Sequence, residues 1–152
     1  MNRKELAQGY FKQGYNCAQS VVMAFRDLTG LGEEESAKLA SSFGGGLGRM
    51  REVCGTVSGM AIVAGILFGY DDPKAPGAVQ KHYALVQELA GAFRERNGSI
   101  VCRELLGDHS PIRSAPDART AEYYKKRPCV ELVGDATEIL EKKIEALRSN
   151  AE

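Results

Sequence analysis

Four cysteines have the most distinctive chemistry of any residues in this chain. Two of them open nearly identical stretches, CRELLGD from Cys102 and CVELVGD from Cys129. A thiolate attacks disulfides, reacts with oxidants and binds metals. The repeated frame therefore predicts paired sulfurs, either a redox disulfide or two ligands of one metal site. The competing interpretation is that Glu, Leu and a Gly-Asp stop are ordinary helix residues, which leaves the frame without a chemical meaning.

The cysteine spacing excludes several well-known local motifs. The chain has no CxxC pair of the thioredoxin or zinc-ribbon type, no CxxCH for covalent haem, and no ferredoxin-type run. A site that uses all four cysteines must therefore be assembled by the fold from distant segments.

Each cysteine falls in the predicted first turn of a helix. Unpaired backbone N–H groups and the helix dipole place partial positive charge there, which stabilises a thiolate and lowers the thiol pKa. The sequence thus predicts four activated thiols, in these places: Cys17 after the cap Asn16, Cys54 after a glycine-rich segment, Cys102 three residues after the cap Ser99, and Cys129 after Pro128.

A glycine-rich segment, GGGLG at 44–48, precedes two arginines, Arg49 and Arg51. One interpretation is that the arginines offset the negative charge of a metal cluster or attract an anionic substrate; the competing and more common one is that both are solvated. A second hypothesis makes the segment itself the site: backbone N–H groups around Gly45 and Gly46 would hold an anion at a helix start. The segment lacks both the lysine of a P-loop and a preceding strand.

A third hypothesis is a cysteine nucleophile activated by histidine. The chain has two histidines, His82 and His109, and either would have to reach Cys17 or Cys54. A lone histidine is more often a packed or surface residue, so this hypothesis ranks below the other two.

The hydrophobic pattern predicts an all-α protein, an irregular helical bundle around a buried, glycine-containing central helix within Val53 to Tyr70. Gly55 and Gly59, four residues apart on that helix, would let a neighbouring helix or a second copy in a homodimer approach closely. The other predicted helices span 2–13, 16–28, 33–42, 79–96, a short one at Cys102, 117–126 and 128–147, the last with a possible break at 134–135.

Length and charge narrow the class of protein. The 152 residues predict one domain, 1–152, and twenty basic residues balance twenty acidic ones, which argues against a nucleic-acid partner. The 53–70 run is barely long enough to cross a bilayer and contains Thr and Ser, so we expect no membrane insertion. The charged N-terminus lacks an export signal, which predicts a cytoplasmic protein.

Taken together, these motifs resemble the redox-active protein family defined by four cysteines and a CGAxxG motif, C_GCAxxG_C_C. The matching stretches are GYNCAQS around Cys17, FGGGLGRMREVCGTVSG around Cys54, CRELLG at Cys102 and the Pro128-Cys129 pair. One departure is Thr56, which stands where the motif has alanine. Split-Soret cytochromes resemble the family more distantly and add haem attachment and an iron–sulfur cluster.

The resemblance implies that Cys17, Cys54, Cys102 and Cys129 act together in a helical redox protein, an oxidoreductase if it is an enzyme. The thiols would exchange with disulfides, Cys102 and Cys129 first, or all four would bind an iron–sulfur cluster or zinc. It also implies a redox partner linked to a membrane transporter, because family members tend to be encoded near transporter genes.

Overall fold

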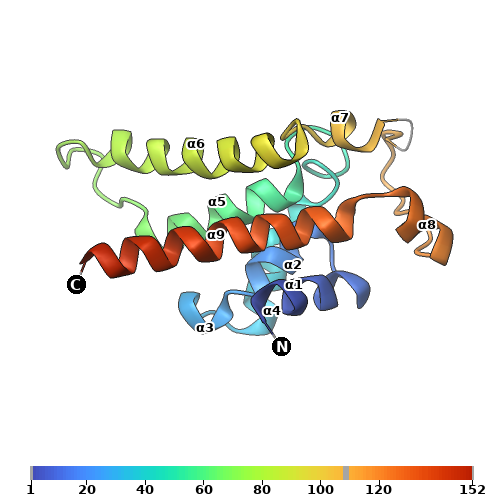
Figure 1. Ribbon diagram of the computed structural model, residues 1–152, viewed down its shortest axis with the longest axis horizontal. Helices are drawn as coiled ribbons and strands as arrows, with labels where there is room; N and C mark the ends of the chain where they lie inside the picture. Colours follow the sequence, from blue (N-terminus) through green and yellow to red (C-terminus); the bar gives the residue numbers. More distant parts are fainter. Residues whose placement is uncertain (1, 108–109, 152) are drawn as a thin grey trace.

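The computed structural model describes residues 2–107 and 110–151 and confirms the all-α class. Figure 1 shows long helices packed side by side, with shorter helices around them. The helices are α1 (Arg3–Lys12), α2 (Cys17–Met23), α3 (Arg26–Thr29), α4 (Glu33–Ala40), the 3-10 turn η1 (Ser41–Phe43), α5 (Gly55–Phe68), α6 (Ala78–Asn97), α7 (Cys102–Leu106), α8 (Ala121–Lys126) and α9 (Cys129–Ala151).

The central helix is α5, as predicted. Its sequence is apolar on every side, which is typical of a helix surrounded by other elements. A β-carbon added at Gly55 would collide with the sulfur of Cys17, and one added at Gly59 would lie 3.1 Å from the carbonyl oxygen of Ala18. The two glycines therefore let α2 pack directly against α5, which confirms their predicted role within one chain.

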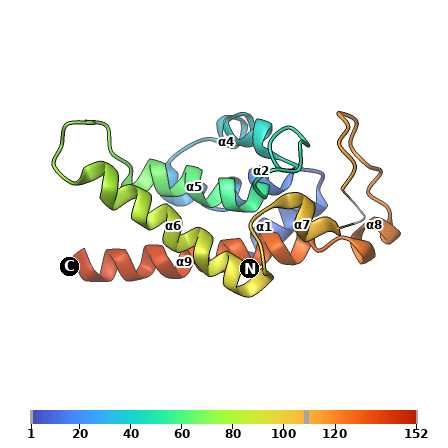
Figure 2. The same ribbon diagram turned by 90° about the horizontal axis from the view of Figure 1, so that it is seen from above.

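The long helices are arranged so that their ends near the cysteines coincide. Helices α5 and α9 run in the same direction and α6 runs in the opposite one, so α5 and α9 begin where α6 ends (Figure 1). Helices α7 and α8 lie at this same end, and Figure 2 shows residues 110–120, which precede α8, looping out there. Among the described residues, no helix is both long and apolar enough to cross a membrane.

The amino-terminal helices fix the position of Cys17. Asn16, the predicted cap, forms a capping box with Gln19: the Asn16 side chain accepts from the Gln19 N–H, and the Gln19 side chain accepts from the Asn16 N–H. This arrangement satisfies two backbone donors at the start of α2. Helix α1 packs on α9, and α2 packs on both α4 and α5.

Several predicted helix boundaries are wrong. Helix α2 stops at Met23, and a separate helix, α3, follows it. Helix α8 begins at Ala121 rather than residue 117, with Thr120 as its cap. Helix α7 begins at Cys102 itself, because the Ser99 hydroxyl accepts from the Val101 N–H in a turn before the helix. Helix α9 continues without a break through residues 134–135.

The repeated seven-residue frame has two different structures. Cys102 and Cys129 are each the first residue of a helix, as predicted. Gly107 then ends α7 with a φ of 58°, whereas Gly134 lies inside α9, packed close to the Gln8 side chain. The similarity is therefore confined to the helix start, and Asp108 lies outside the described residues.

Candidate functional site

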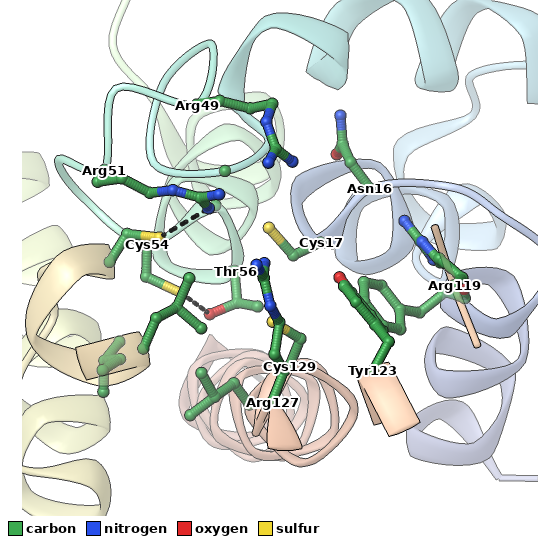
Figure 3. Close-up of a pocket in the computed structure, with 17 residues that line it drawn as sticks. Asn16, Cys17, Arg49, Arg51, Cys54, Thr56, Arg119, Tyr123, Arg127 and Cys129 are labelled. Carbon is green, nitrogen blue, oxygen red and sulfur yellow. Dashed lines mark hydrogen bonds between the residues drawn. The ribbon is translucent and has the colours of Figure 1, made fainter. Parts of the chain in front are cut away.

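All four cysteines line one cavity at the end of the bundle where α5 and α9 begin. Figure 3 shows the sulfurs of Cys17, Cys54 and Cys129 facing this space. The cavity has a volume of about 70 Å³, which is room for roughly five water-sized groups. Its lining includes the four cysteines, Asn16, Gly45, Thr56, Tyr123 and the arginines Arg49, Arg51, Arg119 and Arg127.

A short backbone pairing brings Cys54 and Cys102 together. Val53 and Val101 form an isolated antiparallel bridge, and the N–H of Cys102 donates to the carbonyl of Glu52 at 2.6 Å. Side chains alternate between the two faces of an extended segment. The two cysteines, one residue after each bridge partner, therefore point to the face opposite the valines. No local sequence pattern predicts this bridge, because its two sides are far apart in the chain.

The glycine-rich segment forms a left-handed turn. Five consecutive residues, 45–49, have φ between 54° and 73°, and Arg51 has a φ of 62°. Side chains with a β-carbon adopt this conformation at a cost of roughly 1–2 kcal/mol per residue. The chain accepts this cost at Leu47, Arg49 and Arg51, and the turn directs both arginine side chains to the cavity.

The glycines allow the turn to approach the cysteines. A β-carbon on Gly46 would lie 2.7 Å from the β-carbon of Cys102, and the N–H of Gly45 donates toward the sulfur of Cys17. The N–H groups of residues 47–52 donate to carbonyls of residues 42–47. These six donors are therefore already used, and the segment also directs the guanidinium groups of Arg49 and Arg51 to the cavity.

The prediction of activated thiols is wrong for three of the four cysteines. Burial raises the pKa of Cys54, raises that of Cys17, and raises that of Cys129 to about 12. Backbone N–H groups at the start of α2 oppose the shift at Cys17, but desolvation is the larger effect. These thiols are therefore protonated at neutral pH.

The four thiols interact electrostatically with one another. After burial, repulsion from Cys17 contributes more to the raised pKa of Cys54 and of Cys129 than repulsion from Cys102 does. Cys17 also lies directly against Gly55, the residue after Cys54. Cys17 is therefore the thiol best placed to reach the others.

The arginines make the cavity strongly basic. Arg51 is only 2% exposed; its Nη1 lies 3.7 Å from the sulfur of Cys102 and its Nε donates to the Pro111 carbonyl. Arg119 donates to the carbonyls of Phe11 and Tyr15. Neither arginine forms an ion pair with a carboxylate within residues 2–107 and 110–151.

One carboxylate balances part of this charge. Asp117 accepts from Arg49 at 3.1 Å and from Arg127 at 2.6 Å, and it also pairs with Arg113. Burial, followed by repulsion from Arg51 and Arg127, lowers the pKa of Arg49. The positive charges are therefore not fully compensated.

Three residues that line this cavity stand outside the predicted site: Arg119, Tyr123 and Arg127. The Arg127 side chain is only 9% exposed and lies over the ring of Tyr123. Thr120, which caps α8, was the available signal that Arg119 and Tyr123 flank a helix start.

Neither histidine supports the nucleophile hypothesis. His82 lies on α6 against the ring of Tyr70 and beside the turn after α5, and it does not line the cysteine cavity. His109 lies outside the described residues.

The described geometry contains neither a disulfide nor a ready metal site. All four cysteines are free thiols. Within the described part of the chain, no three side chains of His, Cys, Asp or Glu lie close enough together to hold one metal ion. Both the zinc and the iron–sulfur interpretations therefore stay predictions.

Comparison with known proteins assigns the chain to a family. Residues 15–143 match the model of the family described as "Putative redox-active protein (C_GCAxxG_C_C)", so the chain belongs to this family, and the resemblance is confirmed. A protein of Archaeoglobus fulgidus, described as uncharacterized, is 26% identical over 132 residues, covering 82% of this chain and 81% of that protein. No solved structure matches the chain.

Proposed function

We propose that this protein is a thiol redox protein whose four cysteines act as one set inside a basic cavity. The observation that carries the proposal is that cysteines from four distant helix starts line one space of about 70 Å³. Placing four cysteines around one cavity is not required for packing, because small apolar residues fill such positions equally well. The family description supports the same class of chemistry.

The chemistry is reversible oxidation of two thiols. Two S–H bonds break and one S–S bond forms; the two electrons and two protons pass to a small disulfide, whose own S–S bond becomes two thiols. Since burial keeps three of the thiols protonated at neutral pH, one thiol must lose its proton before it attacks. Cys102 is the proposed attacking thiol, because the guanidinium of Arg51 lies 3.7 Å from its sulfur.

Cys17 is the proposed partner of the attacking thiol. It is the cysteine whose charge most affects Cys54 and Cys129, and its own pKa responds to Cys102. This assignment replaces the expected Cys102–Cys129 pair with one that contains Cys17.

The test is intact-mass analysis of the reduced protein after treatment with 2-hydroxyethyl disulfide, a small neutral oxidant. We expect monomeric protein lighter by two hydrogen atoms per S–S bond, with the mass restored by a dithiol reductant. The Cys17→Ser variant should stop at a mixed disulfide with the reagent, because the resolving thiol is absent. Wild-type protein that retains four thiols throughout would contradict the proposal.

The same spectra distinguish the metal-binding alternative. Protein purified without oxygen is measured under native and then denaturing conditions. Additional mass that disappears on denaturation would identify a bound cluster or metal and would favour the iron–sulfur or zinc hypothesis over disulfide exchange.

A further inference from the structure

The guanidinium of Arg51 has an unused donor in a place where donors are rarely left unused. The residue is 2% exposed, and its Nη2 has no hydrogen-bond partner in the described structure. A buried, unsatisfied charged donor carries a large desolvation cost, so such a group requires an explanation. Figure 3 shows this guanidinium directed into the cysteine cavity, between the glycine-rich turn and Cys17.

The backbone independently indicates that the position of Arg51 matters. Arg49 and Arg51 both have left-handed φ values, 63° and 62°, which side chains with a β-carbon rarely adopt. Strained residues of this kind cluster at ligand-binding sites, where the surrounding structure maintains them. The strain here places two guanidinium groups on one wall of the cavity.

The charge inventory of the cavity identifies the class of ligand. Four arginines line it, and the single carboxylate that pairs with any of them is Asp117, within the described residues. Counting those groups alone leaves a net charge of +3 (four minus one). The three thiols with raised pKa do not offset it, because they are neutral at pH 7. An anion would supply the missing charge and the missing acceptor together.

We propose that the cysteine cavity binds a small oxyanion, held by the guanidinium of Arg51 beside the four thiols. Guanidinium groups bind the planar edges of oxyanions through two parallel hydrogen bonds, and a space of about 70 Å³ accommodates an anion of about five heavy atoms. The inference rests on the proposed function in that it concerns the same cavity, but anion binding does not require the thiols to be oxidised.

The test uses sulfate, which thiols do not reduce, as the probe. Binding to the reduced full-length protein is measured by titration calorimetry at constant ionic strength, with chloride as the compensating salt. In parallel, the rate of cysteine alkylation by the neutral reagent iodoacetamide is measured with and without sulfate. We expect sulfate to bind and to slow alkylation several-fold, because the anion occupies the path to the sulfurs.

Two variants locate the site. Arg51→Gln should weaken sulfate binding about tenfold or more, because a charged hydrogen bond is lost. Arg94→Gln makes the same change at an exposed position on α6 and should bind as the wild type does. Circular dichroism establishes that each variant is folded.

The result that overturns the inference is sulfate that does not bind, or that binds without slowing alkylation of the wild type. Equal binding by a folded Arg51→Gln variant would overturn it as well. If Arg51→Gln does not fold, the effect of sulfate on alkylation of the wild-type protein still tests the inference. A protein that does not bind sulfate could still carry out the proposed thiol chemistry, because oxidation by 2-hydroxyethyl disulfide is measured in a separate experiment.

Discussion

At the scale of single residues, burial decides the chemistry of this site. Cys54 and Cys102 are 5% and 7% exposed, and desolvation outweighs the helix-start donors that would otherwise favour a thiolate at Cys17. A resting site with protonated thiols is protected from general oxidants, because thiolates rather than thiols react. The thiols would then react mainly with molecules small enough to enter the cavity.

The raised pKa of Cys129 predicts how stability depends on pH. Its folded value is about 12, above its ordinary value of 9.0. The folded state therefore binds more protons between these values, and the contribution to stability is complete below about pH 9 and is lost as pH rises toward 12. By pH 10 the free energy of unfolding should fall by about 1.4 kcal/mol from this group alone.

Urea unfolding at pH 8 and pH 10 checks this expectation. The Cys129→Ser variant does not titrate in this range, so its loss of stability between the two pH values should be smaller by about that amount. Identical losses in the variant and the wild type would contradict the assignment of a raised pKa to Cys129.

At the scale of elements, the contact between α2 and α5 determines where Cys17 lies. Gly55→Ala places a methyl group against the Cys17 sulfur and near the Phe43 carbonyl. We expect a loss of about 1–3 kcal/mol in the free energy of unfolding, as for other overpacked sites. Urea unfolding measures the change.

Gly65→Ala is the matched control on the same helix. A β-carbon at Gly65 meets nothing within 4 Å, so the alanine should stabilise the protein by about 0.5–1 kcal/mol through its higher helix propensity. If both substitutions stabilise the protein, the close approach of α2 to α5 is wrong.

The sequence predicts the elements well where a local signal exists. The cap at Asn16 lies where expected, and the bounds of α6 lie within one residue of the predicted 79–96, because caps and helix ends depend on neighbouring residues. The bridge between Val53 and Val101 has no local signal, because its two sides are far apart in the chain. The same reason explains why Gly107 and Gly134, which have similar local sequences, have different conformations.

The candidate site was predictable only in part. The four cysteines, Arg49 and Arg51 were predictable because they lie in or next to recognisable sequence motifs. Arg119 and Arg127 could not be distinguished from surface arginines, because their burial comes from the packing of residues 110–120 and α8 over α1 and α9. The raised pKa values of the thiols could not be predicted from the sequence either, because desolvation depends on the assembled cavity.

At the scale of the whole molecule, Asp117 joins the glycine-rich turn to the segment before α8. Asp117→Asn leaves Arg49 and Arg127 without their carboxylate. We expect a loss of about 2–4 kcal/mol in the free energy of unfolding, because a largely buried ion pair is broken on one side. Thermal unfolding followed by circular dichroism measures it.

The effect of sulfate on the melting temperature is a second measurement on the Asp117→Asn variant. The variant cavity carries one more positive charge, so sulfate should raise its melting temperature more than that of the wild type. Asp71→Asn, at an exposed position in the turn after α5, should change neither quantity measurably. A variant as stable as the wild type would show that Asp117 does not hold these segments together.

The central claim is that four cysteines distant in sequence form one redox set around Cys17. The most direct measurement is peptide mapping by mass spectrometry of protein oxidised with 2-hydroxyethyl disulfide, then alkylated and digested without reductant. The account predicts an intramolecular disulfide that joins the peptide of Cys17 to that of another cavity cysteine. Four alkylated cysteines with no cross-linked peptide, or disulfides only between separate molecules, would contradict it.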